Sequence, residues 1–268
     1  MDLKLAGKTA LVSGSTAGIG LAIAGGLALE GATVYVNGRT AGRVQTAVEH
    51  VKALKEKARQ TQGAVEGIAA DLGTVEGCVD LFSELPKVDI LVNNLGIFEV
   101  KLFAQISDDD WRRFFEVNVL SGVRLSRQYL PWMLKNNWGR IVFISSESGL
   151  QIPLEMIHYG MTKTAQLAVA RGLAQSAAGT GVTVNSILVG PTASEGASNF
   201  VADLAKQRGI SEAEVENEFF QSVRPSLIKR FATPEEVASM VVFVASEKST
   251  AITGAALRVD GGVVRSIV

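Results

Sequence analysis

The chain has 268 residues, and its 26 lysines and arginines nearly balance its 27 aspartates and glutamates, for a formal net charge of −1. This balance argues against nucleic acid as a general partner, and the single cysteine, Cys78, excludes a disulfide within the chain. No apolar run reaches the roughly 18 residues that a membrane span needs, and the sequence begins without a signal-peptide pattern, so we expect a soluble, cytoplasmic protein.

Short apolar runs, rich in β-branched residues and bounded by Gly, Asn, Asp or Ser, predict strands. They cover residues 9–13, 32–36, 64–70, 88–94, 139–146, 181–189 and 254–262. Most are apolar on both faces, as is typical of parallel strands covered by helices. Helical periodicity separates them, for example over 18–31, 43–60 and 107–137. This alternation predicts an α/β fold, a doubly wound parallel sheet (Rossmann fold) of about seven strands with helices on both faces.

We expect one domain over residues 1–268, because no linker, repeat or low-complexity segment divides the chain. The segment of about 190–232 interrupts the alternation, since it is longer than a plain crossover and contains a helical pattern over 211–220. Long insertions of this kind often cover a site. The segment is therefore predicted to be a substrate lid.

A glycine-rich turn follows the first predicted strand, with Gly14, Gly18 and Gly20 in the order G-x-x-x-G-x-G. Backbone amides of such a turn, together with the N-terminus of the next helix, form a binding site for a pyrophosphate group. Glycine can serve there for close packing alone. Its place in the first βα unit favours dinucleotide binding.

The end of the second predicted strand reads VNGRT and contains no acid. A carboxylate at this point would bind both hydroxyls of the adenosine ribose and repel a 2′-phosphate. Arg39 lies there instead, and its planar guanidinium is suited to phosphate. The sequence therefore favours NADP(H), with NAD(H) and an ordinary exposed arginine as the alternative.

Tyr159 and Lys163 lie four residues apart in HYGMTK, a spacing that places both side chains on one face of a helix. A free tyrosine has a pKa of ~10, poorly matched to neutral pH. A nearby ammonium group favours the phenolate and is expected to lower that pKa. The pair is suited to protonating a carbonyl oxygen while a nicotinamide delivers hydride to the carbon.

In order along the chain, these pieces resemble the short-chain dehydrogenase/reductase family over nearly the whole length. The matching motifs are SGSTAGIG (13–20), AADLG (69–73), NNLG (93–96), EVNVLSG (116–122), ISS (144–146), YGMTK (159–163), VGPT (189–192) and VDGG (259–262). Two positions depart from the family's pattern. Leu95 stands where the family usually has alanine, and Val189 stands where it usually has the proline of a Pro-Gly pair.

The resemblance implies a catalytic set of Asn118, Ser146, Tyr159 and Lys163. Tyr159 would be the acid and base, and Ser146 would hold the carbonyl oxygen. Lys163 would lower the pKa of Tyr159 and bind the nicotinamide ribose, and Asn118 would position a water that links Lys163 to solvent. Implied cofactor contacts, besides Arg39, are Gly14, Ser15, Gly18, Ile19, Gly20, Asp71, Leu72, Asn93, Gly96, Tyr159, Lys163, Gly190, Pro191 and Thr192. The resemblance also implies a homodimer or homotetramer.

Other chemical side chains have competing interpretations. Glu147 either contacts a cationic or hydroxylated substrate or makes a structural hydrogen bond. His158 is expected to be a pocket wall or a surface residue rather than a base, since adjacent helical side chains diverge by about 100°. Cys78 is expected to be a buried helix residue, and Asp108–Asp110 a helix start rather than a pair of catalytic acids. No grouping of residues has metal-ligand spacing.

The sequence thus predicts an NADP(H)-dependent oxidoreductase that acts on a ketone or a secondary alcohol. Apolar residues in 150–157 and 193–225 predict a pocket for a small to medium, largely apolar substrate. The alternatives are the same chemistry with NAD(H), a non-catalytic nucleotide sensor or scaffold on this fold, and an epimerase or dehydratase on an extended form of it. The complete catalytic set argues against the sensor, and the short chain and VDGG ending argue against the extended form.

Overall fold

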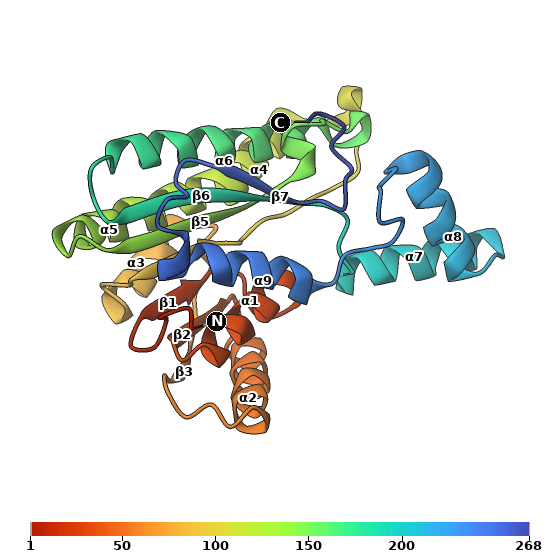
Figure 1. Ribbon diagram of the computed structural model, residues 1–268. Helices are drawn as coiled ribbons and strands as arrows, with labels where there is room; N and C mark the ends of the chain where they lie inside the picture. The colour runs from red at the N-terminus through yellow and green to blue at the C-terminus, as the bar shows by residue number, and fades with distance from the viewer. Residues whose placement is uncertain (1, 194, 268) are drawn as a thin grey trace.

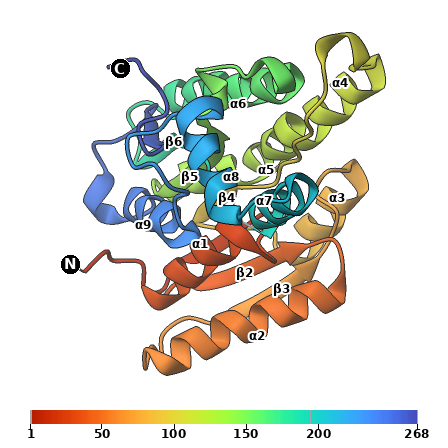
Figure 2. The same cartoon turned by 90° about the vertical axis from the view of Figure 1, so that its right-hand side faces the viewer.

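The computed structural model describes residues 2–193 and 195–267, and their side chains except those of 195–200 and 203 (Figures 1 and 2). Within this part of the chain, seven strands form one sheet in the order β3-β2-β1-β4-β5-β6-β7. All neighbouring pairs are parallel. The strands are β1 (Thr9–Val12), β2 (Thr33–Gly38), β3 (Val65–Ala69), β4 (Ile90–Asn93), β5 (Gly139–Ser146), β6 (Val182–Val189) and β7 (Ala256–Val259).

Helices cover both faces of this sheet, which confirms the predicted doubly wound α/β fold (Figure 1). They are α1 (Gly18–Leu29), α2 (Ala41–Lys57), α3 (Val75–Glu84), α4 (Asp108–Phe115), α5 (Ser121–Lys135), α6 (Ile157–Ser176), α7 (Glu195–Arg208), α8 (Glu212–Glu218) and α9 (Pro234–Val244). None of the helices in the described residues is long and apolar enough to span a membrane.

Alternating side chains of the strands supply two separate cores. Val12 of β1 packs in one core with residues of α1, α2 and α9, and its neighbour Leu11 packs in the other with residues of α3, α5 and α6. Every residue of β5 and β6 is buried, as expected for central parallel strands. These strands end opposite each other, with Ser146 paired to Val189, so their carboxyl ends meet at one edge of the sheet.

Residues 108–135, which follow the loop after β4, form a nearly continuous helix. Ser107 caps α4 through a capping box with Asp110, which confirms that the acidic run at Asp108 is a helix start. A π-helical turn, Glu116–Leu120, then joins α4 to α5. The π turn is important because it carries Asn118.

The predicted lid is a helical hairpin with its own small apolar core. It contains α7, α8 and a π-helical turn, Phe219–Val223, and α7 is a helix that the sequence pattern did not predict. A bridge between Thr192 and Ala232 closes its base. Figure 1 shows α7 and α8 projecting from the rest of the molecule, and Figure 2, viewed from that side, shows them in front of the sheet. The hairpin therefore faces the edge where the strands end.

The turn after β6 lies so close to the end of β7 that no side chain fits at Gly190. A Cβ there would lie 2.6 Å from the carbonyl oxygen of Asp260 and 2.7 Å from its Cα. We therefore expect Gly190→Ala to lower the free energy of unfolding by ~1–3 kcal/mol, measured by denaturant titration.

The matched control is Gly172→Ala in α6, where nothing lies within 4 Å of the added Cβ. That change is expected to raise the free energy of unfolding by ~0.5–1 kcal/mol, because alanine favours the helix. A Gly190→Ala protein as stable as the control would contradict the close approach.

Candidate active site

The glycine turn has a backbone that other residues would not adopt or fit. Gly14 and Gly18 have φ angles of 60° and 53°, in the left-handed region. A Cβ at Gly20 would lie 2.6 Å from the carbonyl oxygen of Gly14. The helix begins at Gly18 with Ala17 at the N-cap, and this cap has no side chain that bonds the first amides. The turn therefore leaves backbone donors suited to a pyrophosphate.

Two asparagines that the sequence reading assigned no role lock this turn in place. Asn37, at the end of β2, accepts from the backbone N–H of Gly14 at 3.2 Å and donates to the carbonyls of Ile68 and Ala70. Asn94 donates to the carbonyls of Ser13 and Gly14 at 3.0 and 2.9 Å. The sequence signals that could have indicated this role are the same for both residues, namely an asparagine at the end of a predicted strand.

The other residues predicted to contact the cofactor differ in whether their side chains are exposed or buried. Ser15 is fully buried, and its hydroxyl donates to the carbonyl of Val12 at 2.7 Å, so only its backbone faces the turn. Leu72 is a core residue, whereas Asp71 is exposed and holds Gly73 through a hydrogen bond of 3.0 Å. Ile19 lies partly buried against the core. These positions line the same edge of the sheet, but not all of them through their side chains.

The end of β2 carries no carboxylate in the structure either. Arg39 is exposed there, directly after Gly38. A Cβ at Gly38 would lie 2.4 Å from Cγ2 of Thr16, so the strand end packs closely against the glycine turn. Arg39 is thus placed beside the turn on a rigid strand end, as a reader of the adenosine ribose needs to be.

The end of β5 and the first turn of α6 bring Ser146, Tyr159 and Lys163 together. The Ser146 hydroxyl lies near the Tyr159 phenol and acts to lower its pKa. The Lys163 ammonium lies 5.6 Å from the centre of the Tyr159 ring and donates to the carbonyl of Ile144 at 2.9 Å. Phe98 packs edge-on against the Tyr159 ring at 6.4 Å. A phenol, a hydroxyl and an ammonium therefore share one half-buried site.

Burial dominates the electrostatics of this site. It raises the pKa of Tyr159, an effect that the Ser146 hydroxyl opposes and the charge of Glu147 strengthens. It also lowers the pKa of Lys163 from 10.5 to about 8, against the charge of Glu147. The prediction that Lys163 lowers the pKa of Tyr159 is therefore wrong for this structure. The ammonium bonds a backbone carbonyl rather than the phenol, and desolvation of the phenol prevails.

Asn118 lies on the π-helical turn and ties three segments together. Its Nδ2 donates to the carbonyl of Ile97 and to Oγ1 of Thr162, each at 3.0 Å, and its Oδ1 accepts from the N–H of Ile97 at 2.7 Å. The backbone carbonyl of Asn118 accepts from Gln166 at 2.6 Å. A π turn is frequent at functional sites, because the extra residue re-aims side chains and carbonyls.

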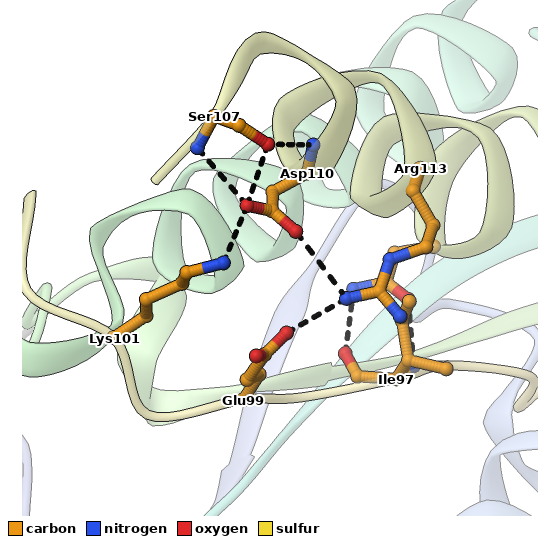
Figure 3. A network of polar contacts seen from close by, with 7 residues as sticks. Ile97, Glu99, Lys101, Ser107, Asp110 and Arg113 are labelled. Atoms are coloured by element: carbon orange, nitrogen blue, oxygen red, sulfur yellow. Dashed lines mark hydrogen bonds and ion pairs between the residues drawn. The ribbon is translucent and has the colours of Figure 1, made fainter. Parts of the chain in front are cut away.

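An ionic network, shown in Figure 3, fixes the loop that leads from β4 to α4. Asp110 accepts from Lys101 at 2.6 Å, and Arg113 lies 2.7 Å from Glu99 and 3.6 Å from Asp110. The Lys101 and Ser107 hydrogen bonds hold the pKa of Asp110 well below its usual range. The network holds the segment that carries Phe98 beside the catalytic helix.

Glu147 has almost no exposed surface and contacts Ser146. Its carboxylate accepts hydrogen bonds from the hydroxyls of Ser146 and, at 3.1 Å, Ser148. Arg224, at the end of the helical hairpin, lies 3.7 Å from it and donates to Glu155 at 2.6 Å. The structural hydrogen bond expected of Glu147 is thus observed, while its contact with a substrate stays a prediction. Arg224 is a residue that sequence reasoning missed.

His158 is buried among aromatic side chains and does not face the site. Its ring lies 4.0 Å from that of Phe114 and 6.0 Å from that of Trp111, and its exposed fraction is 0%. Burial lowers its pKa. The surface position considered for His158 is therefore wrong, because Trp111 and Phe114 of α4 pack on its ring.

Cys78 is buried in α3 as expected, and burial raises the pKa of its thiol.

The remaining predicted residues lie at the ends of β4 and β6. Asn93 is buried and donates to Ser126 at 3.2 Å. Gly190 donates to the carbonyl of Val259 at 3.1 Å and accepts from Oγ1 of Thr192 at 3.0 Å. The carbonyl of Pro191 accepts from Ala232. The described residues contain no group of His, Cys, Asp or Glu side chains that could hold a metal.

The predicted site residues therefore come from the strand ends at one edge of the sheet and from the turns and helices beside them, and β1 and β4 lie adjacent at this edge. At this point the strand order reverses, and ligands of doubly wound folds bind there. The Lys163 ammonium and the Asn118 amide oxygen each lie 3.5 Å from the place of a Cβ at Gly96. Glycine at 96 thus leaves open the space between Lys163 and Asn118.

Comparisons with known proteins agree with this arrangement. Residues 8–205 match the family model described as short chain dehydrogenase. The chain is 48% identical to the uncharacterized oxidoreductase YvaG of Bacillus subtilis over 100% of both chains. It is 34% identical to the 3-oxoacyl-[acyl-carrier-protein] reductase FabG of Aquifex aeolicus, over 98% of this chain and 99% of that one. The solved L-sorbose reductase of Gluconobacter frateurii, complexed with NADPH and L-sorbose, is 33% identical over 100% of both chains, with a TM-score of 0.90.

The lowered pKa of Lys163 makes stability depend on pH in a defined window. Between pH 8 and pH 10.5 the unfolded chain keeps the lysine proton while the folded protein has lost it, so stability rises with pH. Lys163→Met has no such titration. The free energy of unfolding of the wild type is therefore expected to rise relative to this variant by ~1 kcal/mol per pH unit.

The measurement is denaturant unfolding of both proteins at about pH 7.5, 8.5 and 9.5, with the two free energies subtracted at each pH. Groups common to both proteins cancel in the difference. A difference that stays constant over this range would contradict the buried, partly neutral lysine.

Proposed function

Because the chain belongs to the short-chain dehydrogenase/reductase family, we propose that it is an NADP(H)-dependent enzyme that interconverts a ketone and a secondary alcohol. The family assignment establishes an NAD(P)-dependent oxidoreductase. The proposal adds the cofactor preference, the roles of the residues and the type of substrate. One observation carries it, the grouping of the Tyr159 phenol with the Ser146 hydroxyl and with the Lys163 ammonium, which lies 5.6 Å from the centre of the Tyr159 ring.

In the proposed mechanism Tyr159 gives a proton to the carbonyl oxygen as hydride arrives at the carbon. Burial raises the pKa of Tyr159, so at neutral pH the phenol is protonated and able to donate. Ser146 holds the same oxygen and stabilises the charge that develops on it. In the direction of alcohol oxidation the proton moves the opposite way.

Lys163 is proposed to hold the nicotinamide ribose, and Asn118 is proposed to support the return of the proton through a water. The open space at Gly96, flanked by the Lys163 ammonium and the Asn118 amide oxygen, supports a water between them. The nicotinamide would supply the hydride, and Gly190, Pro191 and Thr192 would flank it. With a pKa of about 8, Lys163 can lose and regain a proton near neutral pH.

The preference for NADP(H) rests on Arg39 and on what surrounds it. Asn37 is a polar side chain at the end of β2, but its amide is already engaged with Gly14, Ile68 and Ala70. Among residues 33–40 of the described chain no carboxylate opposes a 2′-phosphate, and the exposed guanidinium of Arg39 follows the strand. The NADPH bound by the similar L-sorbose reductase supports the same preference.

The substrate pocket is proposed to be apolar away from the reacting carbonyl. Phe98 contacts the catalytic tyrosine and is 65% exposed, and Leu150 and Ile152 are exposed on the loop before α6. Val223 at the end of the hairpin is also exposed. We propose that the hairpin of about 190–232 is a lid that closes these surfaces over a small to medium substrate, within one catalytic domain.

A homodimer or homotetramer is proposed for the assembled enzyme, through the helices that carry Asn118 and Tyr159. Apolar side chains exposed near these helices support it, among them Phe103 at 65% and Phe115 at 39%. Such a contact would also cover the outer side of α4.

Replacing Tyr159 by phenylalanine removes the proton donor and keeps the ring. We expect Tyr159→Phe to bind NADPH with a near wild-type Kd and to lose ketone reduction by ~100-fold or more. Binding is measured by NADPH fluorescence and turnover by absorbance of the cofactor.

The control is Tyr35→Phe, a half-buried tyrosine of β2 outside the site, which should reduce ketones at the wild-type rate. Residual turnover of Tyr159→Phe within tenfold of the wild type would refute the role of the phenol.

Placing a carboxylate at Arg39 tests the cofactor preference. Arg39→Asp is expected to raise the KM for NADPH ~100-fold and to leave or lower the KM for NADH, because aspartate repels the 2′-phosphate and accepts from the ribose hydroxyls. Steady-state kinetics with each cofactor give the two values.

Arg59→Asp, at an exposed position after α2, makes the same change of charge away from the site and should change neither KM. An equal rise for NADPH and NADH in Arg39→Asp would exclude Arg39 as the reader of the phosphate.

A further inference from the structure

The carboxylate of Glu147 lies buried at the point where the substrate carbonyl would bind. Glu147 directly follows Ser146, its exposed fraction is 5%, and one of its oxygens accepts the Ser146 hydroxyl proton. The other oxygen accepts from Ser148 at 3.1 Å and lies 3.7 Å from Nε of Arg224. A negative group is thus built into the polar end of the site rather than exposed at its rim.

The protons around Ser146 allow only one arrangement in this structure. Its hydroxyl oxygen accepts from the N–H of Ser148 at 3.1 Å, and its single proton goes to Glu147. The Ser146 proton is therefore engaged with Glu147 in this structure.

A bound carbonyl would disturb the hydrogen bonds of Ser146, because a carbonyl oxygen can only accept hydrogen bonds. Once Ser146 turns its proton to the carbonyl oxygen, the facing oxygen of Glu147 loses its donor. A buried charged acceptor without a donor is costly, and the cost falls on binding and turnover. A substrate hydroxyl beside the carbonyl would replace the lost proton.

We propose that Glu147 selects substrates that carry a hydroxyl group on the carbon next to the carbonyl and rejects substrates in which that neighbouring carbon is the carbon of a carboxylate. The inference rests on the proposed function and narrows its substrate class to uncharged hydroxyketones. The apolar surfaces of Phe98, Leu150 and Ile152 then contact the remainder of the substrate.

The surrounding charges decide between a hydroxylated and a cationic substrate. Arg224 already places its guanidinium between Glu147 and Glu155, at 3.7 Å and 2.6 Å. Its side chain is only 14% exposed, so a substrate cation would have to displace a partly buried ion pair. A hydroxyl needs only the acceptor oxygen that faces Ser146. An anionic substituent would meet the carboxylate of Glu147, whose neighbouring guanidinium, Arg224, is already engaged with Glu155.

Three substrates of nearly equal size test the inference, namely butan-2-one, 1-hydroxybutan-2-one and 2-oxobutanoate. Each is assayed with NADPH and NADH, and kcat/KM is expressed relative to butan-2-one. For the wild type we expect the hydroxyketone to be preferred at least tenfold over butan-2-one. Comparing ratios between the wild type and a variant removes differences in the intrinsic reactivity of the three carbonyls.

Two variants should move the ratios in opposite directions. Glu147→Gln keeps the volume and removes the charge, so the relative kcat/KM for 2-oxobutanoate should rise at least tenfold and the preference for the hydroxyketone should fall. Arg224→Gln leaves Glu147 without its cation, so 2-oxobutanoate should be used even less while the hydroxyketone remains preferred. Arg112→Gln removes an arginine that is paired with Asp109 on the surface of α4 and should leave both ratios unchanged.

The outcomes distinguish a failure of the proposed function from a failure of the inference about Glu147 alone. A wild type that reduces none of the three compounds with either cofactor refutes the proposed function and the inference together. A wild type that reduces them, with ratios that Glu147→Gln leaves within twofold, overturns the inference alone. A fall in 2-oxobutanoate use in Glu147→Gln would also overturn it, because Glu147 would then serve only to hold Arg224. If Glu147→Gln does not fold, unchanged 2-oxobutanoate use in Arg224→Gln overturns the inference.

Discussion

The geometry of the site depends on one buried amide, the side chain of Asn118. Its Nδ2 donates to the carbonyl of Ile97 and to the hydroxyl of Thr162, and its Oδ1 accepts from the N–H of Ile97. The Thr162 hydroxyl in turn donates to the carbonyl of Tyr159 at 2.7 Å. A buried amide is stable only when its donors and its acceptor are bonded, so these contacts fix the β4 loop, the π turn and α6 relative to one another. The position of the phenol at the edge of the sheet follows from them.

Burial then determines which groups carry charge. It keeps the phenol of Tyr159 protonated and brings the pKa of Lys163 to about 8, while the charge of Glu147 raises the pKa of both groups. A neutral phenol beside a weakly held ammonium proton suits the delivery of a proton to a carbonyl. The same burial makes the hydrogen bonds of Glu147 costly to break, which links the protonation of the site to the choice of substrate.

Local sequence patterns predict most of the fold and the central part of the site. Strands, the glycine turn and the helical spacing of Tyr159 and Lys163 depend on neighbouring residues, and the sequence therefore predicts them well. The π turn at Asn118 was not predictable, because an extra residue in a helix is stabilised by contacts with distant segments. Nor was the contact of Arg224 with Glu147, since it joins the hairpin to the end of β5. The pKa of Tyr159 was predicted in the wrong direction because sequence spacing shows the nearby charge and not the desolvation.

A crystal structure of the enzyme with NADP⁺ and 1-hydroxybutan-2-one tests the central claim most directly. The account predicts that the carbonyl oxygen lies within hydrogen-bonding distance of both Tyr159 Oη and Ser146 Oγ, with the carbonyl carbon facing the nicotinamide. It also predicts that the hydroxyl group donates to the Glu147 oxygen that now accepts from Ser146. A carbonyl oxygen bound away from Tyr159 and Ser146 would contradict the assignment of this site as the place where the ketone is reduced.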